Sequence, residues 1–534
     1  MNVLLSLLQK STDYNQLLKA VEAKQAVAVS GLSQAPRSHV LAAAHEQSGR
    51  PLVAVCQDDM AAKRLASELG AFLGEEPPVL PSRELTLAGA IGVSRQWEQQ
   101  RLRLLYALAQ GRVPVLVASL DALLLRTLPR QTLFSASVTL RVGAEYSMPE
   151  LIERLTRAGY SRASLVEGVG QFALRGGILD VYSPAQEKPL RAEFFGDELD
   201  TMGYFDPITQ RRTENVDEAV LLPVAETEPH LHPQGISGLC EDLRAIIARQ
   251  QRRKTPNQAL IETLQKDCEA LENETLFASA DRYMALIYPE FTTAASYLPQ
   301  EAVVAFCDHG NLQRGEKDRA EEFGLLLDSF LTSGTLFGEL CDYYATMDDL
   351  AASLRGRAVI YCDSFLAARY PESLPPKQLL SFTARQLPGY GGSLETAAAD
   401  LKNYASNQYG SIVLCGGQRR GEILKELLAK SGLNALLSFP LTKLPQPGQI
   451  LIAGGSLPAG LEYPTLKFAI LTEGQLLVKK NERKVTPKKA PSNRKKLESF
   501  TDLAPGDLVV HEHHGIGRFV GMVKMTVDGV PRDY

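Results

Sequence analysis

The chain has 534 residues, a formal net charge of −5 and 45% hydrophobic side chains. At about 100–200 residues per domain, this length exceeds one hydrophobic core and predicts three to five domains. No apolar run approaches the roughly 18 residues that span a bilayer, and the N-terminal stretch lacks the basic n-region of a signal peptide. We therefore expect a cytoplasmic protein without membrane contact.

The first 125 residues alternate strand-like and helix-like patterns. Apolar runs at 25–31, 51–56 and 113–119 predict buried strands, the last of the kind found in parallel sheets. After the second run, Asp58 or Asp59 caps a segment with the apolar periodicity of a helix. Strand–helix alternation with short links predicts an α/β unit.

The turn after the first strand has the outline of a phosphate-binding loop. The frame G-x-x-x-x-G-K-[ST] fits Gly31 to Ser38, but Pro36 stands where the second glycine belongs and Arg37 where the lysine belongs. A working loop needs free backbone N–H groups, a lysine for the β- and γ-phosphates and a hydroxyl for Mg²⁺. Proline has no N–H, and arginine lacks the compact ammonium group.

The acidic pair expected at the end of a later strand is altered as well. ATP-driven motors place an Asp-Glu pair there, whereas this chain reads Asp308 followed by histidine. Together the two departures predict a vestigial nucleotide site, made of Gly31, Pro36, Arg37, Ser38 and Asp308, that does not hydrolyse nucleotide. Two alternatives stay open: Ser38 simply caps the following helix, or the turn never bound nucleotide.

From about residue 133 the pattern changes to strands. The stretches 162–184 and 190–211 consist of short alternating runs split by Gly and Asp turns. We expect a small antiparallel sheet inserted into the α/β unit. Helices follow over about 238–270 with a break at Pro256, and the apolar run in 301–311 returns the chain to the parallel sheet.

A second strand–helix alternation begins at about 357 with "AVIYCDS". A basic segment follows it: residues 479–496 hold nine Lys/Arg and one acid, a charge of +8, which leaves the rest of the chain near −13 (−5 minus 8). Its prolines and polar residues favour a solvated linker. Contact of this segment with DNA phosphates stays open.

The last stretch, from about 504 onward, is strand and glycine turn throughout. Its glycines indicate tight turns in a small barrel. The pattern stops in mid-strand, and one hairpin cannot bury a core, so we interpret the chain as a fragment of a longer protein. His511 and His513 would share a strand face, but no third ligand follows at recognisable spacing. Since the seven cysteines are scattered as well, we predict reduced core thiols and no metal site.

Two motifs resemble known families. "LRGGILDVYSP" followed by "RAEFFGDELDTMGYFDPITQR" resembles the inserted domain of UvrB, and more closely the matching region of the transcription-repair-coupling factors. The ending "GDLVVHEHHGIGRFVG" resembles the RNA-polymerase-interacting domain of the same family, a module shared with CarD-type regulators. The order of parts resembles this family over all 534 residues, although 230–470 matches mainly by order and length.

The resemblance implies transcription-coupled nucleotide excision DNA repair. Members of the family bind stalled RNA polymerase, displace it with an ATP-driven double-stranded-DNA translocase, and recruit UvrA. The translocase would lie beyond this chain, which would be a monomeric recruitment fragment without enzymatic activity or cofactor. ATP and Mg would belong to the full-length parent. Two alternatives stay open: a self-contained UvrB-like ATP-dependent excision-repair enzyme, and a plain transcription regulator.

The resemblance also implies site residues. The UvrA-binding patch carries over to Arg175, Arg191 and Phe195. Arginine and aromatic residues are common interface anchors, and alternation would send either Phe194 or Phe195 into the core. Arg191 could instead form a cross-strand pair with Glu193 or Asp197. In the terminal module, family members add a strand edge to the polymerase β subunit, which predicts Met525 and Val527 as polymerase-binding residues.

We therefore predict an α/β multidomain chain. A degenerate P-loop-type parallel sheet carries an inserted small α+β domain, mainly antiparallel β, and is followed by a second α/β domain and the first strands of a small β-barrel. The expected order is the first part of the UvrB-like α/β domain (1–130), the UvrA-binding insertion (131–228), the second part of the UvrB-like domain (229–355), the second α/β domain (356–475), the basic linker (476–498) and the truncated polymerase-interacting domain (499–534).

Overall fold

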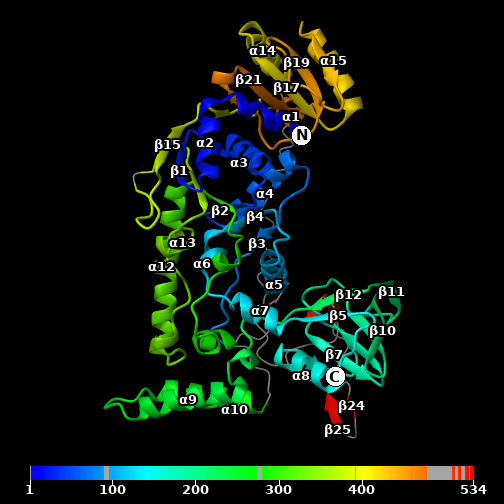
Figure 1. Ribbon diagram of the computed structural model, residues 1–534, viewed down its shortest axis with the longest axis vertical. Helices are drawn as coiled ribbons and strands as arrows, with labels where there is room; N and C mark the ends of the chain where they lie inside the picture. The colour runs from blue at the N-terminus through cyan, green and yellow to red at the C-terminus, as the bar shows by residue number, and fades with distance from the viewer. Residues whose placement is uncertain are drawn as a thin grey trace.

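The computed structural model describes most of the chain. The described residues are 2–88, 96–273, 279–367, 369–390 and 393–477, and the strands at 508–511, 515–518, 524–527 and 530–533. No helix among them is long and apolar enough to cross a membrane. Figure 1 shows an elongated arrangement, with the second α/β unit at one end of the first and the inserted sheet near the other end. This confirms a multidomain α/β fold.

Seven strands form the first sheet, in the order β15-β1-β14-β13-β2-β4-β3, and every neighbouring pair runs parallel. The strands are β1 (Ala26–Ser30), β2 (Leu52–Cys56), β3 (Val79–Leu80), β4 (Val115–Ser119), β13 (Val303–Cys307), β14 (Ala358–Cys362) and β15 (Gln378–Ser381). All positions of β1, β2, β4, β13 and β14 are buried, as expected of a sheet covered on both faces. β13 rejoins this sheet after the insertion, as the sequence predicted.

Two strands from the range predicted for the second α/β domain (356–475), β14 and β15, lie in the first sheet instead. "AVIYCDS" was expected to open the second α/β unit, but it forms β14, between β1 and β13 of the first sheet. Val359 lies in register with Ala26 on one side and with Val304 on the other. A five-residue apolar strand suits the middle of any parallel sheet, so its sequence cannot assign it to one sheet or the other.

Helices cover both faces of the first sheet. Side chains of β1 alternate between two cores, with Val27 and Val29 in one and Ala26 and Ala28 in the other. The first core takes residues from α1 (Asn2–Ser6), α2 (Thr12–Glu22), α3 (Gln34–Ser48) and α4 (Asp59–Leu73). The second takes residues from α5 (Gln96–Ala109), α6 (Leu120–Leu124), α7 (Arg130–Ala136), α9 (Gly235–Gln251), α10 (Gln258–Glu272), α11 (Met284–Ile287), α12 (His309–Thr332) and α13 (Met347–Ser353).

Two helix boundaries in this unit agree with the sequence predictions. Asp58 caps α4, its Oδ1 accepting the Ala61 N–H at 2.7 Å. α9 and α10 are separate helices on either side of Pro256 and pack against each other. Figure 1 shows this pair at the end of the molecule far from the second α/β unit, and the long α12 running along one side.

The inserted unit is a six-stranded sheet in the order β11-β10-β9-β8-β7-β6. Its strands are β6 (Ser161–Arg162), β7 (Gln171–Arg175), β8 (Ile178–Val181), β9 (Leu190–Phe195), β10 (Glu198–Phe205) and β11 (Arg212–Asn215). All neighbours are antiparallel except β6 and β7. β5 (Val138–Arg141) pairs with β12 (Glu218–Leu221), and α8 (Met148–Arg157) shares the core of one sheet face.

The second α/β unit has six strands in the order β16-β20-β21-β17-β19-β18. They are β16 (Arg385–Gln386), β17 (Gly410–Cys415), β18 (Ala435–Ser438), β19 (Ile450–Gly454), β20 (Leu461–Tyr463) and β21 (Phe468–Thr472), with helices α14 (Leu394–Ser406), α15 (Gln418–Lys430) and α16 (Glu473–Leu477). Ile412, Leu461 and Ile470 share a core with α1 to α4, so the two α/β units pack directly against each other.

A buried histidine lies where the two α/β units meet. His39 of α3 is fully buried; its Nε2 lies 3.0 Å from the Leu4 carbonyl and its Nδ1 lies 2.9 Å from the Tyr463 hydroxyl of β20. Because a carbonyl can only accept, Nε2 carries the proton and Nδ1 accepts the tyrosine O–H. The neutral ring therefore joins α1, α3 and the second sheet.

The terminal residues contribute two hairpins to the described structure. β22 (Leu508–His511) pairs antiparallel with β23 (Gly515–Arg518), and β24 (Lys524–Val527) pairs antiparallel with β25 (Val530–Asp533). Met525 and Val527 lie on β24. The first two residues of the predicted basic linker (476–498) belong to α16, and the rest of the linker and His513 lie outside the described residues. The small barrel stays a prediction.

Candidate functional site

The residues of the predicted phosphate loop form the turn from β1 into α3. Gly31 has φ +78°, a conformation that favours glycine, and a β-carbon on it would lie 2.0 Å from the Phe382 carbonyl oxygen. The segment after β15 therefore lies directly against Gly31 and leaves no room for a side chain there. The backbone follows a strand–turn–helix path.

The backbone amides of this turn bind other segments of the same chain. Gly31 N–H donates to the Ser364 carbonyl at 3.2 Å, and Leu32 N–H points to the Asp363 carbonyl at 3.4 Å. Amides of this kind are the donors that surround phosphates in a working loop. Here they close the loop against the segment that follows β14.

The start of α3 continues this pattern. Ala35 N–H donates to the Gln386 side-chain oxygen at 3.2 Å, and Pro36 has no N–H to offer. Ser33, not Ser38, precedes the first residue of α3, so the alternative that Ser38 caps this helix is wrong. Ser38 lies inside the helix, fully buried, and its hydroxyl contacts a carboxylate oxygen of Glu68 at 2.5 Å. That hydroxyl is therefore engaged within the core.

The structure pairs two residues of the predicted vestigial site with each other. Arg37 Nη1 lies 2.6 Å from Asp308 Oδ2, and the arginine side chain is 7% exposed. Asp308 follows β13, the strand expected to end in acid. The groups that would bind phosphate and magnesium in a motor thus neutralise each other across 271 residues of sequence.

The inserted sheet brings the three predicted UvrA-binding residues to one face. Arg191 and Phe195 lie four positions apart on β9, so both point away from the core that takes Leu190 and Ala192. On the neighbouring strands, Arg175 is opposite Ile178, and Ile178 is opposite Glu193 of β9. Strand register therefore places Arg175 on the same face.

A carboxylate that the sequence reasoning missed joins the two arginines. Asp180 of β8 is directly opposite Arg191 in register and is 1% exposed. Its Oδ1 lies 2.7 Å from Arg191 Nε, and its Oδ2 lies 2.5 Å from Arg175 Nη2. Arg191 thus forms a cross-strand pair, but with Asp180 and not with the expected Glu193 or Asp197. The alternation in "GILDVYSP", with Asp180 between two core residues, was the available signal.

Alternation along β9 separates the two phenylalanines. Phe194 packs against the core and lies edge-on to Tyr146, whereas Phe195 is 85% exposed. Gly177 permits this arrangement, because a β-carbon there would lie 2.7 Å from the Phe194 carbonyl oxygen. The prediction that only one of the pair is exposed agrees with this placement. Phe195 and Ile178 are thus exposed apolar side chains on the same sheet face as the two arginines.

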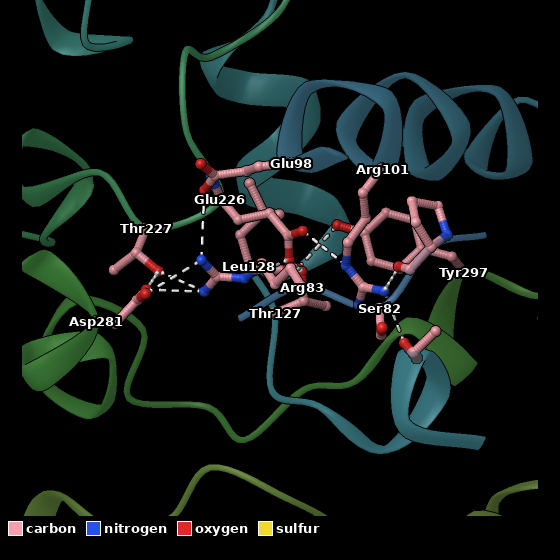
Figure 2. Close-up of polar contacts among 12 residues, drawn as sticks. Ser82, Arg83, Glu98, Arg101, Thr127, Leu128, Glu226, Thr227, Asp281 and Tyr297 are labelled. Atoms are coloured by element: carbon pink, nitrogen blue, oxygen red, sulfur yellow. Dashed lines mark hydrogen bonds and ion pairs between the residues drawn. The ribbon is translucent and has the colours of Figure 1, made fainter. Parts of the chain in front are cut away.

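A buried ionic network connects the insertion to the first α/β unit (Figure 2). Glu226, where the chain returns from the insertion, is fully buried; its Oε1 lies 2.7 Å from Arg101 Nε on α5. Its other oxygen accepts the Thr127 hydroxyl at 2.5 Å. Arg83 pairs in turn with Asp281 at 2.8 Å. Five chain segments therefore meet at one charged cluster.

Among the described residues, one group has ligand atoms close enough together to hold a metal ion: Cys240, Cys268 and Glu272. Their ligand atoms lie within 4.8 Å of one another. The carboxylate of Glu272 is already paired with the Arg244 guanidinium, a cation that opposes metal binding at this point. The seven cysteines are free thiols, and all except Cys341 are buried.

Comparison with known proteins places two family models on the chain. Residues 138–226 match the UvrB interaction domain, which includes the face that carries Arg175, Arg191 and Phe195. Residues 503–534 match the CarD-like/TRCF RID domain, which includes β24. Both matches fall on the motifs that the sequence analysis singled out.

The chain is also similar along its whole length to curated relatives. A transcription-repair-coupling factor of Staphylococcus aureus (strain USA300) is 27% identical over 539 residues, covering 99% of this chain and 45% of the relative. The transcription-repair-coupling factor of Bacillus subtilis (strain 168) is 24% identical over 536 residues, covering 99% of this chain and 44% of the relative. The chain thus spans about half the length of these relatives. The resemblance predicted from the sequence is confirmed.

Proposed function

We propose that this chain, similar along its length to transcription-repair-coupling factors, is the recruitment part of such a factor in transcription-coupled nucleotide excision repair. It binds stalled RNA polymerase through the terminal module, with Met525 and Val527 on the strand offered to the β subunit. It recruits UvrA through the inserted sheet. The ATP-driven double-stranded-DNA translocase, with its ATP and Mg, belongs to the portion of the relatives that this chain does not cover.

One observation carries this proposal. Within the stretch that matches the UvrB interaction domain, Arg175 is half-exposed and Phe195 is 85% exposed on one sheet face. Exposed arginine and aromatic side chains are the usual anchors of protein interfaces. The rival function, a UvrB-like ATP-dependent enzyme, is disfavoured because the phosphate-loop amides are bound to the chain's own carbonyls. We therefore assign no catalytic role to this chain, which acts as a monomer.

We expect the chain to bind UvrA and the Arg175→Glu variant to bind it at least about tenfold more weakly. The guanidinium is half-exposed on the same sheet face as Phe195, so reversal of its charge places a carboxylate within the proposed contact surface. Isothermal titration of purified UvrA into the chain measures this difference. Arg157→Glu is the matched control, because it makes the same charge change on exposed α8, which packs on the opposite side of the sheet. Equal affinity of the Arg175 and Arg157 variants would contradict the assigned face.

We expect the chain not to bind ATP–Mg at concentrations up to about 1 mM. Restoring the motif with Pro36→Gly and Arg37→Lys should not create binding either, because the Gly31 and Leu32 amides would still face the segment after β14. Titration with a fluorescent ATP analogue measures both proteins, with intact UvrB as the positive control. Micromolar affinity that depends on Arg37 or Ser38 would instead support the UvrB-like enzyme.

A further inference from the structure

The two arginines of the inserted sheet differ in how many of their donors are engaged. Arg191 donates from Nε and Nη2 to Asp180, from Nη1 to the Gln210 carbonyl at 3.1 Å, and from Nη2 to Gln210 Oε1 at 3.2 Å. Four of its five N–H donors are therefore engaged within the sheet. Its guanidinium also lies 4.5 Å from the centre of the Phe205 ring, and its side chain is 17% exposed.

Arg175 is held at a single point. Its Nη2 contacts Asp180 Oδ2 at 2.5 Å, while the side chain is 49% exposed. Two guanidinium groups thus share one carboxylate, which leaves one positive charge uncompensated at this point. Because Arg191 is enclosed, that charge is presented to solvent by Arg175.

We propose that Asp180 is the positioning residue of the UvrA-binding face, an inference that rests on the function proposed above. Its buried carboxylate holds Arg191 in place within the sheet. The same carboxylate orients Arg175, whose guanidinium then pairs with a carboxylate of the partner. Phe195, on the same face, enters an apolar recess of that partner. The proposed partner surface therefore carries an acidic side chain next to an apolar recess.

The geometry gives Asp180 this role for two reasons. Asp180 is the acceptor that Arg175 contacts. Without it the long arginine side chain would sample several rotamers, and ordering it on binding would cost affinity. Asp180 also holds Arg191 against Gln210, which has φ +59° in the turn that displays the 81% exposed Ile208. Preorganisation of this kind raises affinity without a direct contact.

A double-mutant cycle between Asp180 and Arg175 tests the inference. We expect Asp180→Asn to weaken binding of purified UvrA about tenfold when Arg175 is present, and less than about twofold in the Arg175→Ala background. A purely structural role would not produce this difference, because damage to the sheet would weaken binding equally in both backgrounds. Asp200→Asn removes an exposed carboxylate of the same sheet and should leave the affinity unchanged.

The outcomes separate this inference from the proposed function. If the unaltered chain does not bind UvrA, both the proposed function and this inference are wrong. Suppose that the chain binds UvrA and that Arg175→Ala lowers the affinity. If Asp180→Asn then leaves the affinity unchanged, or lowers it equally with and without Arg175, only the positioning role is wrong. Should Asp180→Asn unfold the sheet, Asp180→Glu keeps the charge and moves the carboxylate by one methylene. We expect it to weaken binding several-fold with the same dependence on Arg175, and additive costs would overturn the inference.

Discussion

Replacing Glu226 with glutamine is expected to destabilise the junction between the insertion and the first α/β unit by about 3–5 kcal/mol. Glu226 and Arg101 are both fully buried and lie 2.7 Å apart. Arg101 also donates to the carbonyls of Pro81 and Ala122, but those groups carry no charge. Removal of the carboxylate therefore leaves a buried guanidinium without a counter-ion, which is among the costliest single changes in a core.

Hydrogen exchange of the amides in 222–232 and in α5 measures this effect locally, which suits a multidomain chain that does not unfold in one step. Glu218→Gln is the matched control, because its pair with Arg141 is exposed on both sides and is worth about 0–1 kcal/mol. The double change Glu226→Leu with Arg101→Met should restore part of the loss. Equal effects of the Glu226 and Glu218 variants would show that the network does not hold the junction.

Lowering the pH is expected to weaken the contact between the two α/β units through His39. Burial lowers the pKa of His39 to about 4, against about 6.5 in an unfolded chain. The folded state therefore binds this proton less readily than the unfolded state, so the stability is fully present above pH 6.5 and is lost as the pH falls toward 4. Between pH 6.5 and 5 the loss is about 2 kcal/mol, at about 1.4 kcal/mol per pH unit.

Melting temperatures at pH 7 and pH 5 measure this dependence. His39→Gln keeps a donor for the Leu4 carbonyl and an acceptor for Tyr463, so it should lose less stability between the two pH values than the unaltered chain. His45→Gln, on the same helix but partly exposed, should retain the full dependence. Burial also lowers the pKa of His309 to about 4, so further replacement of His309 should reduce the acid sensitivity of the His39 variant again. An unchanged pH slope in His39→Gln would contradict the assignment.

The sequence predicted the parts of the fold that follow from local patterns. Apolar runs located β1, β2, β4 and β13, and the insertion was recognised from short alternating strands. The same patterns assigned β14 to the second α/β unit, because a uniformly apolar strand carries no mark of its neighbours. For the candidate site, alternation along β9 separated Phe194 from the exposed Phe195. It did not reveal Asp180, whose importance depends on register with another strand.

The sequence by itself determined the strand–helix order, the absence of the second glycine and the lysine from the phosphate-loop frame, and the two motifs that resemble those of transcription-repair-coupling factors. These depend on residues within a few positions of one another. Only the tertiary structure decided that Arg37 pairs with Asp308, that the segment after β14 closes the loop, and that Asp180 and Glu226 each collect two arginines. Such contacts join side chains from different elements. Short-range periodicity predicts whether a segment is a helix or a strand, but not which other element packs beside it.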